Sequence, residues 1–190
     1  MNSLNAQAAI QLIPASQFSI DELTAIYNQT RVDYMIPMPM NAARLREYVE
    51  TYDVDLNRSL VAVEAGEKRG VAMLGVRADR TWITRLGVLP STRRGGVGEA
   101  LMRGLLAQSQ DLKINFSMLE VIKNNVPAHQ LFLKLGFYEV GELLVLRRSP
   151  ANLQIEPVIA DARRLERYEA LDLVSDDRGT QPWTNQSESM

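Results

Sequence analysis

The chain has 190 residues, enough for one domain of ordinary size or two small ones. Hydrophobic residues make up 46% and charged residues 23% of it, close to the globular average, which excludes a disordered or collagen-like chain. Twenty-one basic and 23 acidic side chains give a formal net charge of -2, which argues against a dedicated nucleic-acid or anionic-membrane binder.

Cysteine is absent and histidine occurs once, as His129. The first fact excludes disulfides, thiolate zinc sites, iron–sulfur clusters and a cysteine nucleophile, and the second makes a histidine triad or a multi-histidine metal site hard to assemble. No segment approaches the roughly 20 apolar residues of a membrane span, and the N-terminus lacks the features of a signal peptide. We therefore predict a soluble, cytoplasmic protein with no metal site and no nucleic-acid or membrane partner.

The first third of the chain is predicted to form a short strand and two helices. Residues 8–13 read as the strand, and an acidic start at residue 21 opens a helix that reaches about Tyr34. Two prolines and three methionines break the helical pattern over residues 35–41. A second helix with one apolar face is expected from Asn41.

The middle of the chain is predicted to form a β-meander. Three extended runs, residues 59–66, 70–79 and 81–90, are separated by short turns, which favours antiparallel pairing. An amphipathic helix is expected from about residue 97, followed by a strand over residues 114–122.

The last third is predicted to hold a helix, a strand and an extension. The helix is expected over residues 124–135 and the final strand over residues 136–148. We assign residues 1–150 to one domain, and residues 151–190 to a C-terminal extension with a strand and an amphipathic helix. The extension is expected to make a homodimer contact, although closing over the cleft or beginning a degenerate second copy of the fold are alternatives.

The segment VLPSTRRGGVG, residues 88–98, carries the clearest chemical signal. Its glycines let the backbone approach a ligand, amides at a helix N-terminus bind anions, and Arg93 and Arg94 add positive charge, a combination that suits a phosphate or pyrophosphate. No Walker sequence is present, and Leu101 stands where a dinucleotide fingerprint needs its third glycine. A glycine-rich turn that merely opens a helix explains the isolated loop equally well.

A second motif lies downstream and strengthens the first. The pattern Arg93-x-x-Gly96-x-Gly98, preceded by Val88-x-Pro90, resembles the coenzyme A pyrophosphate loop of the GNAT superfamily of N-acetyltransferases. The downstream signature of that superfamily is similar to Leu119-Glu120-Val121, Asn125-x-x-Ala128, Leu131-Phe132 and Leu135-Gly136-Phe137. The order and separation of the motifs also agree, and the resemblance covers about residues 8–148.

The resemblance implies the fold and the cosubstrate. The expected class is α/β (α+β), with a mixed, largely antiparallel central sheet that is flanked by helices and splayed between its fourth and fifth strands. Acetyl-CoA would enter the wedge between those strands. The residues expected to bind it are Leu86, Gly87, Val88, Arg93, Arg94, Gly95, Gly96, Val97, Gly98, Glu99, Asn125 and Phe132.

The resemblance also implies catalytic roles. Glu120 matches a glutamate proposed as the general base, although a strand glutamate that only faces solvent is an equal alternative. The backbone N–H of Val88 would stabilise the oxyanion if the fourth strand bulges there. Phe132 occupies the position of the tyrosine that usually protonates the departing thiolate, so water or another tyrosine must replace it.

The acceptor is expected to be a primary amine of a small molecule or peptide. Four residues that flank the predicted cleft are candidates for its binding: Tyr34, Met35, Trp82 and Thr84. Two alternative functions stay open. A catalytically impaired acyl-CoA sensor is favoured by Phe132, and a nucleotide-binding protein could use the same glycine loop.

Overall fold

The computed structural model describes residues 9–145, 166, 168–169 and 182–186. The chain divides into two compact units, residues 1–137 and 138–190, and the first holds the sheet and its four covering helices. Most of the predicted C-terminal extension, and the predicted domain boundary near residue 150, lie outside the described residues.

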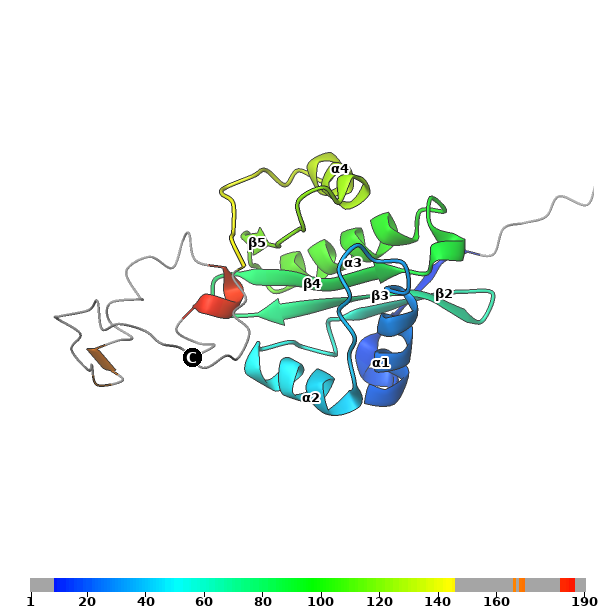
Figure 1. Ribbon diagram of the computed structural model, residues 1–190, viewed down its shortest axis with the longest axis horizontal. Coiled ribbons are helices and arrows are strands. Elements are labelled where there is room, and N and C mark those ends of the chain that lie inside the picture. Colours follow the sequence, from blue (N-terminus) through cyan, green and yellow to red (C-terminus); the bar gives the residue numbers. More distant parts are fainter. Residues whose placement is uncertain (1–8, 146–165, 167, 170–181, 187–190) are drawn as a thin grey trace, which may run out of the picture. The chain divides into compact units, whose positions relative to one another are not determined.

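The sheet has five strands in the order in which they occur along the chain (Figure 1). Successive strands from β1 to β4 pair antiparallel, whereas β5 pairs with β4 in parallel. The pairing of β2 with β3 and of β3 with β4 confirms the meander that the short turns predicted. The strands are β1 (Gln11–Pro14), β2 (Leu60–Glu64), β3 (Glu67–Val76), β4 (Thr81–Val88) and β5 (Ser117–Met118). The expected class, a mixed and largely antiparallel sheet with helical flanks, is confirmed.

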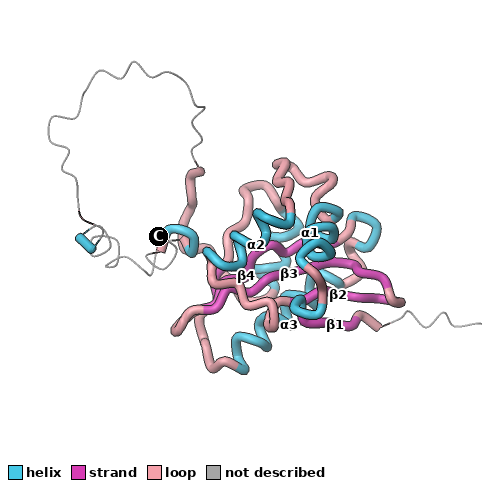
Figure 2. Tube along the Cα trace, turned by 90° about the horizontal axis from the view of Figure 1, so that it is seen from below, coloured by secondary structure: helices cyan, strands magenta, loops and turns pink. Residues whose placement is uncertain are grey.

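Helices cover both faces of this sheet. Figure 1 shows α1 and α2 on one side and α3 on the other, with α4 beyond α3, and Figure 2 gives the same layers from below. The helices are α1 (Ile20–Gln29), α2 (Ala42–Thr51), α3 (Val97–Asp111) and α4 (Val126–Lys134). No described helix has the length and apolar character that a membrane crossing requires.

Side-chain caps set the first turns of two helices. Before α1, the Ser19 hydroxyl accepts a hydrogen bond from the Glu22 N–H (3.2 Å) and the Glu22 carboxylate accepts one from the Ser19 N–H (2.9 Å), a complete capping box. Asn41 caps α2 through the Arg44 N–H (2.8 Å). The predicted extension of the first helix to residue 34 is wrong, because α1 ends at Gln29 and turns replace it.

The core lies between the sheet and α3. Leu60, Ala62, Ala72 and Leu74 point from β2 and β3 toward the buried α3 residues Val97, Leu101, Met102 and Leu105. The alternate residues of the same strands face α1 and α2, and Val61, Val71 and Met73 are also fully buried. Burial on both faces explains why these strands read as nearly continuous apolar runs.

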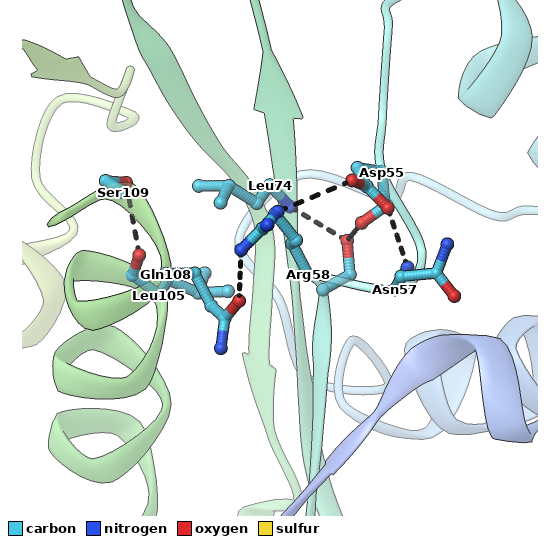
Figure 3. Close-up of polar contacts among 8 residues, drawn as sticks. Asp55, Asn57, Arg58, Leu74, Leu105, Gln108 and Ser109 are labelled. Carbon is cyan, nitrogen blue, oxygen red and sulfur yellow. Dashed lines mark hydrogen bonds and ion pairs between the residues drawn. The ribbon is translucent and has the colours of Figure 1, made fainter. Parts of the chain in front are cut away.

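Polar contacts fasten the connection between α2 and β2 (Figure 3). The Ser59 hydroxyl donates to the Asp55 carbonyl oxygen (2.7 Å) and accepts from the Leu74 N–H (3.0 Å), so the loop is bonded to β3. Arg58 donates from Nη1 to the Gln108 side chain of α3 (2.9 Å). These bonds hold the entry of β2 against both the sheet and the helix behind it.

The fourth and fifth strands separate soon after they meet. Pairing is limited to Thr81 with Ser117 and Trp82 with Met118, and β4 continues to Val88 with no β5 partner in the described chain. This separation is the predicted splay, although the fifth strand is much shorter than residues 114–122. The final strand predicted over residues 136–148 is not formed within residues 136–145, because so short a β5 offers little edge to pair with.

Candidate active site

A bulge interrupts β4 on the side of β3. Thr84 pairs with Met73 and Gly87 with Val71, so two residues of β4, Arg85 and Leu86, face a single residue of β3. Arg85 has a left-handed backbone, with φ of 54°. The bulge expected at Val88 therefore lies two to three residues earlier in the strand.

The unpaired edge of β4 beyond the bulge offers backbone groups to the wedge. The Leu89 N–H donates to the Arg69 carbonyl oxygen of β3 (2.9 Å), so Leu89 and Arg69 form a hydrogen-bonded pair. In an antiparallel ladder the neighbouring residue then turns its N–H and C=O to the opposite edge. Val88 thus directs its backbone away from β3, toward the side on which β5 has diverged.

A cavity of about 90 Å³ lies at this wedge. It is bounded by the chain after α1, by β4, by the segment after β5 and by α4. Five residues predicted for the site line it together: Tyr34, Leu86, Glu120, Asn125 and Phe132. The cavity also takes in Arg31, Ile83, Arg85, Leu119, Val121 and Ala128.

The Glu120 carboxylate is held at the cavity by Trp82. The indole Nε1 of Trp82 donates to Glu120 Oε2 over 2.6 Å. Trp82 is only 4% exposed, and its ring packs against Tyr48 and Tyr52 with centroids 6.0 and 6.2 Å away. Glu120 is therefore oriented by a buried hydrogen-bond donor. Trp82 was expected to contact the acceptor, and in the structure its indole N–H binds the Glu120 carboxylate instead.

Thr84, the other β4 residue predicted for the acceptor, contacts the same aromatic cluster. Its hydroxyl shares a 2.6 Å hydrogen bond with the Tyr48 hydroxyl. Burial raises the pKa of Tyr48 to about 12, an effect that the nearby positive charge of Arg85 partly opposes. Tyr48 is therefore neutral at physiological pH and serves as a fixed hydrogen-bonding group.

Tyr34 and Asn125 meet across the cavity. The Asn125 side-chain amide donates to the Tyr34 hydroxyl over 3.3 Å, which joins the chain after α1 to the start of α4. Met35 is 50% exposed and is not among the cavity-lining residues. The methionine-rich loop is anchored at its end, where the Asn28 side chain donates to the Met40 carbonyl and accepts from its N–H.

The glycine loop opens α3 without a side-chain cap. Gly96 is the N-cap residue, with φ of 85°, and a Cβ added there would meet nothing within 4 Å. The first-turn amides of α3, from Val97 through Glu99, are consequently open to a ligand, and an uncapped helix N-terminus attracts anions. This geometry fits the pyrophosphate of coenzyme A.

The two loop arginines differ in their contacts. Arg93 forms a two-point ion pair with Asp33, both contacts at 2.7 Å, and also donates to the carbonyl oxygens of Thr30 and Val88. The Arg93 hydrogen bonds hold the pKa of Asp33 below its usual value. Arg94 is exposed and forms no ion pair with a described residue. Arg94 is therefore the better placed of the two for a phosphate.

Glu99, also predicted for cosubstrate binding, uses its carboxylate within the protein. It pairs with Lys134 of α4 and with Arg103 of α3, and the hydrogen bond from Lys134 is the main cause that lowers its pKa. The contact with Lys134 joins α3 to α4. What Glu99 can offer a ligand is its backbone amide.

Sequence reasoning missed Arg31 and Arg85. Both line the cavity, and Arg85 occupies the bulge itself. A signal was present for Arg85, because a charged residue stands between Thr84 and Leu86 in an otherwise buried strand. No pattern marked Arg31, which lies just beyond the end of α1.

Comparison with known proteins identifies the family. The family model described as the acetyltransferase (GNAT) family matches residues 21–137, more than half of the chain. The chain therefore belongs to this family. It is an acetyl-CoA-dependent N-acetyltransferase, and it carries the glycine loop, the splayed sheet and the downstream motif together. None of the curated proteins compared with the chain matches it.

Solved structures agree on the fold. Ard1 from Thermoplasma volcanium superposes with a TM-score of 0.58 at 21% identity, covering 68% of this chain and 83% of that protein. The ribosomal-protein-S18-alanine N-acetyltransferase from Escherichia coli gives 0.57 at 19% identity, covering 70% and 80%. The structure of yncA from Salmonella typhimurium with its cofactor acetyl-CoA gives 0.55 at 18% identity, covering 68% and 80%.

Proposed function

We propose that the protein transfers an acetyl group from acetyl-CoA to a primary amine of a small molecule or peptide, by direct attack within a ternary complex. The observation that carries this proposal is the joint presence of Glu120 and the open edge of β4 at one cavity. The amine nitrogen forms a bond to the thioester carbon, the carbon–sulfur bond breaks, and the amine loses a proton.

Glu120 is the proposed general base. An alkyl amine with a pKa of about 10.4 is only about a thousandth neutral near pH 7.4, so removal of its proton assists the attack. The hydrogen bond from Trp82 orients the carboxylate, which is proposed to take the proton of the amine directly or through a relaying water. This support by a buried indole favours the base over a glutamate that only faces solvent.

The backbone N–H of Val88 is the proposed oxyanion donor. It faces the wedge by the alternation of the β3–β4 ladder, and donors fixed in a strand need no rearrangement as negative charge develops. Leu86, Gly87 and Val88 together form the edge proposed to pair with the pantetheine arm. Asn125 and Phe132 form the far wall of the same cavity.

Tyr34 is the proposed donor of a proton to the departing thiolate, in place of Phe132. Its hydroxyl oxygen accepts a hydrogen bond from Asn125, which leaves the hydroxyl hydrogen to be donated. The loop from Arg93 to Glu99 is proposed to hold the pyrophosphate through its amides, with Arg94 supplying the charge.

The test is release of free thiol from acetyl-CoA in the presence of a panel of amines, including amino acids, polyamines, aminoglycosides and peptides. We expect one acceptor class to give turnover, and Glu120→Gln to lower kcat by about 100-fold, within the usual range for general-base catalysis. Binding of coenzyme A without turnover would instead support the acyl-CoA sensor. Absence of coenzyme A binding would reject the proposed function.

A further inference from the structure

Arg31 places a guanidinium in the cavity and has no carboxylate partner among the residues that the structure describes. It donates from Nη2 to the carbonyl oxygen of Leu86 (3.0 Å), and its guanidinium carbon lies 4.2 Å from the centre of the Tyr34 ring. Its Nε is buried and has no hydrogen-bond partner. The contacts of Arg31 thus position the positive charge, and none of them neutralises it.

Arg85 repeats this arrangement from the bulge of β4. It donates from Nη1 to the Tyr27 hydroxyl (3.2 Å), and its guanidinium carbon lies 4.0 Å from the centre of the Tyr48 ring. The Nε of Arg85 is likewise buried without a partner. The strained backbone at this residue, with φ of 54°, keeps a long cationic side chain at the wedge.

The other described arginines are either ion-paired or exposed. Six of them form ion pairs with aspartate or glutamate: Arg58, Arg69, Arg77, Arg80, Arg93 and Arg103. The remaining three, Arg44, Arg46 and Arg94, are exposed. The carboxylate that shares the cavity with Arg31 and Arg85 is Glu120, and it pairs with neither of them in the described structure. The described residues that line the cavity therefore include two guanidinium groups and one carboxylate.

We propose, on the premise of the N-acetyltransferase function above, that the acceptor is an amino acid or a similar small amine that carries a carboxylate close to its amino group. Arg31 and Arg85 bind this carboxylate, and the amino group faces Glu120. A guanidinium fork matches a carboxylate in two-point geometry, and partially buried N–H donors gain most from a charged acceptor. The ligand carboxylate also gives the two guanidinium groups a partner of opposite charge.

The first experiment compares matched acceptors by free-thiol release. L-amino acids are assayed beside their α-carboxamides and the corresponding decarboxylated amines. We expect kcat/KM to be about 10- to 100-fold higher for the carboxylates, the range for one or two charge-assisted hydrogen bonds. Equal or faster reaction of the carboxamides would overturn the inference while leaving the proposed function intact. Absence of turnover with every amine would count against the proposed function itself.

Variants assign the preference to the two arginines. Arg85→Gln and Arg31→Gln should reduce the ratio of carboxylate to carboxamide kcat/KM by about 10-fold or more, mainly through the KM of the acceptor, with Arg85→Lys in between. Arg46→Gln on the exposed side of α2 is the matched control and should keep the ratio. If both variants lower kcat equally for all acceptors, the arginines act on the thioester and the inference fails.

A binding measurement gives a readout that needs no turnover. The enzyme with coenzyme A bound is titrated calorimetrically with an N-acetyl-L-amino acid and with its carboxamide. We expect the acid to bind at least about 10-fold more tightly, and this difference to disappear in Arg85→Gln. The melting temperature of each variant shows that it is folded, and equal affinities in the wild-type protein would contradict the proposed carboxylate site.

Discussion

Trp82 is the residue on which the orientation of the Glu120 carboxylate depends. Phenylalanine at this position keeps an aromatic ring in the cluster with Tyr48 and Tyr52 but removes the indole N–H that donates to Glu120. We expect Trp82→Phe to lower kcat by about 10-fold or more, since hydrogen bonds to charged groups contribute about 1.5–3 kcal/mol. The KM for acetyl-CoA should stay within about 3-fold.

The control for this prediction is Tyr52→Phe, which alters the same aromatic cluster and keeps the indole N–H that donates to the carboxylate. The measurement is the kcat and the KM for acetyl-CoA of both variants, determined by steady-state kinetics with the same acceptor. If Trp82→Phe reacted at the wild-type rate, the indole would contribute only packing, and Glu120 would lose the support that distinguishes it from an ordinary solvent-facing glutamate.

Gly87 shows how closely the end of α1 approaches β4. A Cβ at this position would lie 2.1 Å from Thr30 Oγ1 and 2.7 Å from Thr30 Cβ, and Thr30 is itself buried and bonded to the Tyr27 carbonyl. We expect Gly87→Ala to destabilise the fold by about 1–3 kcal/mol, the usual cost of overpacking. Urea unfolding measures the change.

A double-mutant cycle tests the stated cause. Thr30→Ala removes the oxygen that a Cβ at Gly87 would strike, so the double variant should be less destabilised than the sum of the single variants. Additive effects would mean that the cost of Gly87→Ala arises elsewhere, for instance in the backbone of β4.

Among the elements, α1 depends on charged groups at its start. The Glu22 carboxylate accepts hydrogen bonds from Lys68 and from Ser19, which lower its pKa to about 2 from the ordinary value of 4.5. A carboxylate with a lowered folded-state pKa adds stability above its unfolded pKa, and that stability is lost as the pH falls from about 4.5 toward 2. Acid therefore weakens the first turn of α1.

The corresponding prediction compares Glu22→Gln with the wild-type protein. The variant should be less stable at pH 7, and the difference between the two proteins should shrink as the pH is lowered below 4.5. Ser19→Ala should cost about 1 kcal/mol through loss of the cap. Thermal unfolding between pH 7 and pH 3 measures both, and a Glu22→Gln deficit that did not change with pH would show that the charge is not its cause.

The elements that carry strong local signals were predicted well from the sequence. The meander, α3 and the glycine loop follow from apolar runs between short turns, helical periodicity and the glycines before Val97, all of which act over a few residues. The strand predicted over residues 114–122 is only Ser117–Met118 in the structure, because the length of this strand depends on how many residues of β4 pair with it. Pairing between distant strands is not visible in local pattern.

The residues of the candidate site also differ in whether a local sequence pattern predicts them. Glu120, Asn125 and Phe132 were found from motif resemblance, since their spacing within one segment is nearly fixed. Arg31 comes to the cavity only because α1 ends at Gln29 and the chain turns back across the sheet, a tertiary event with no sequence signature. The bulge that presents Arg85 likewise exists only in the pairing of β4 with β3.

For the whole molecule, the wedge between β4 and the segment after β5 lies where several elements meet. Among the described residues, two paired strand positions and the Trp82–Glu120 hydrogen bond join its sides, and the Glu99–Lys134 ion pair joins α3 to α4. A ligand that bridges the glycine loop and the far wall binds only the folded chain and should therefore stabilise it as a whole. At 100 times its Kd, coenzyme A would add about 2.7 kcal/mol, which corresponds to a melting temperature about 5–11 °C higher.

Gly96→Val and Gly66→Val separate ligand binding from backbone strain. Both glycines have left-handed backbones, with φ of 85° and 79°, and a Cβ at either would meet nothing within 4 Å, so both variants should lose similar intrinsic stability. Gly66 lies in the turn between β2 and β3, outside the segment that carries the glycine loop. Only Gly96→Val should lose the coenzyme A-dependent rise in melting temperature, because a side chain there obstructs the approach of the pyrophosphate to the α3 amides. An undiminished rise in Gly96→Val would place the pyrophosphate elsewhere.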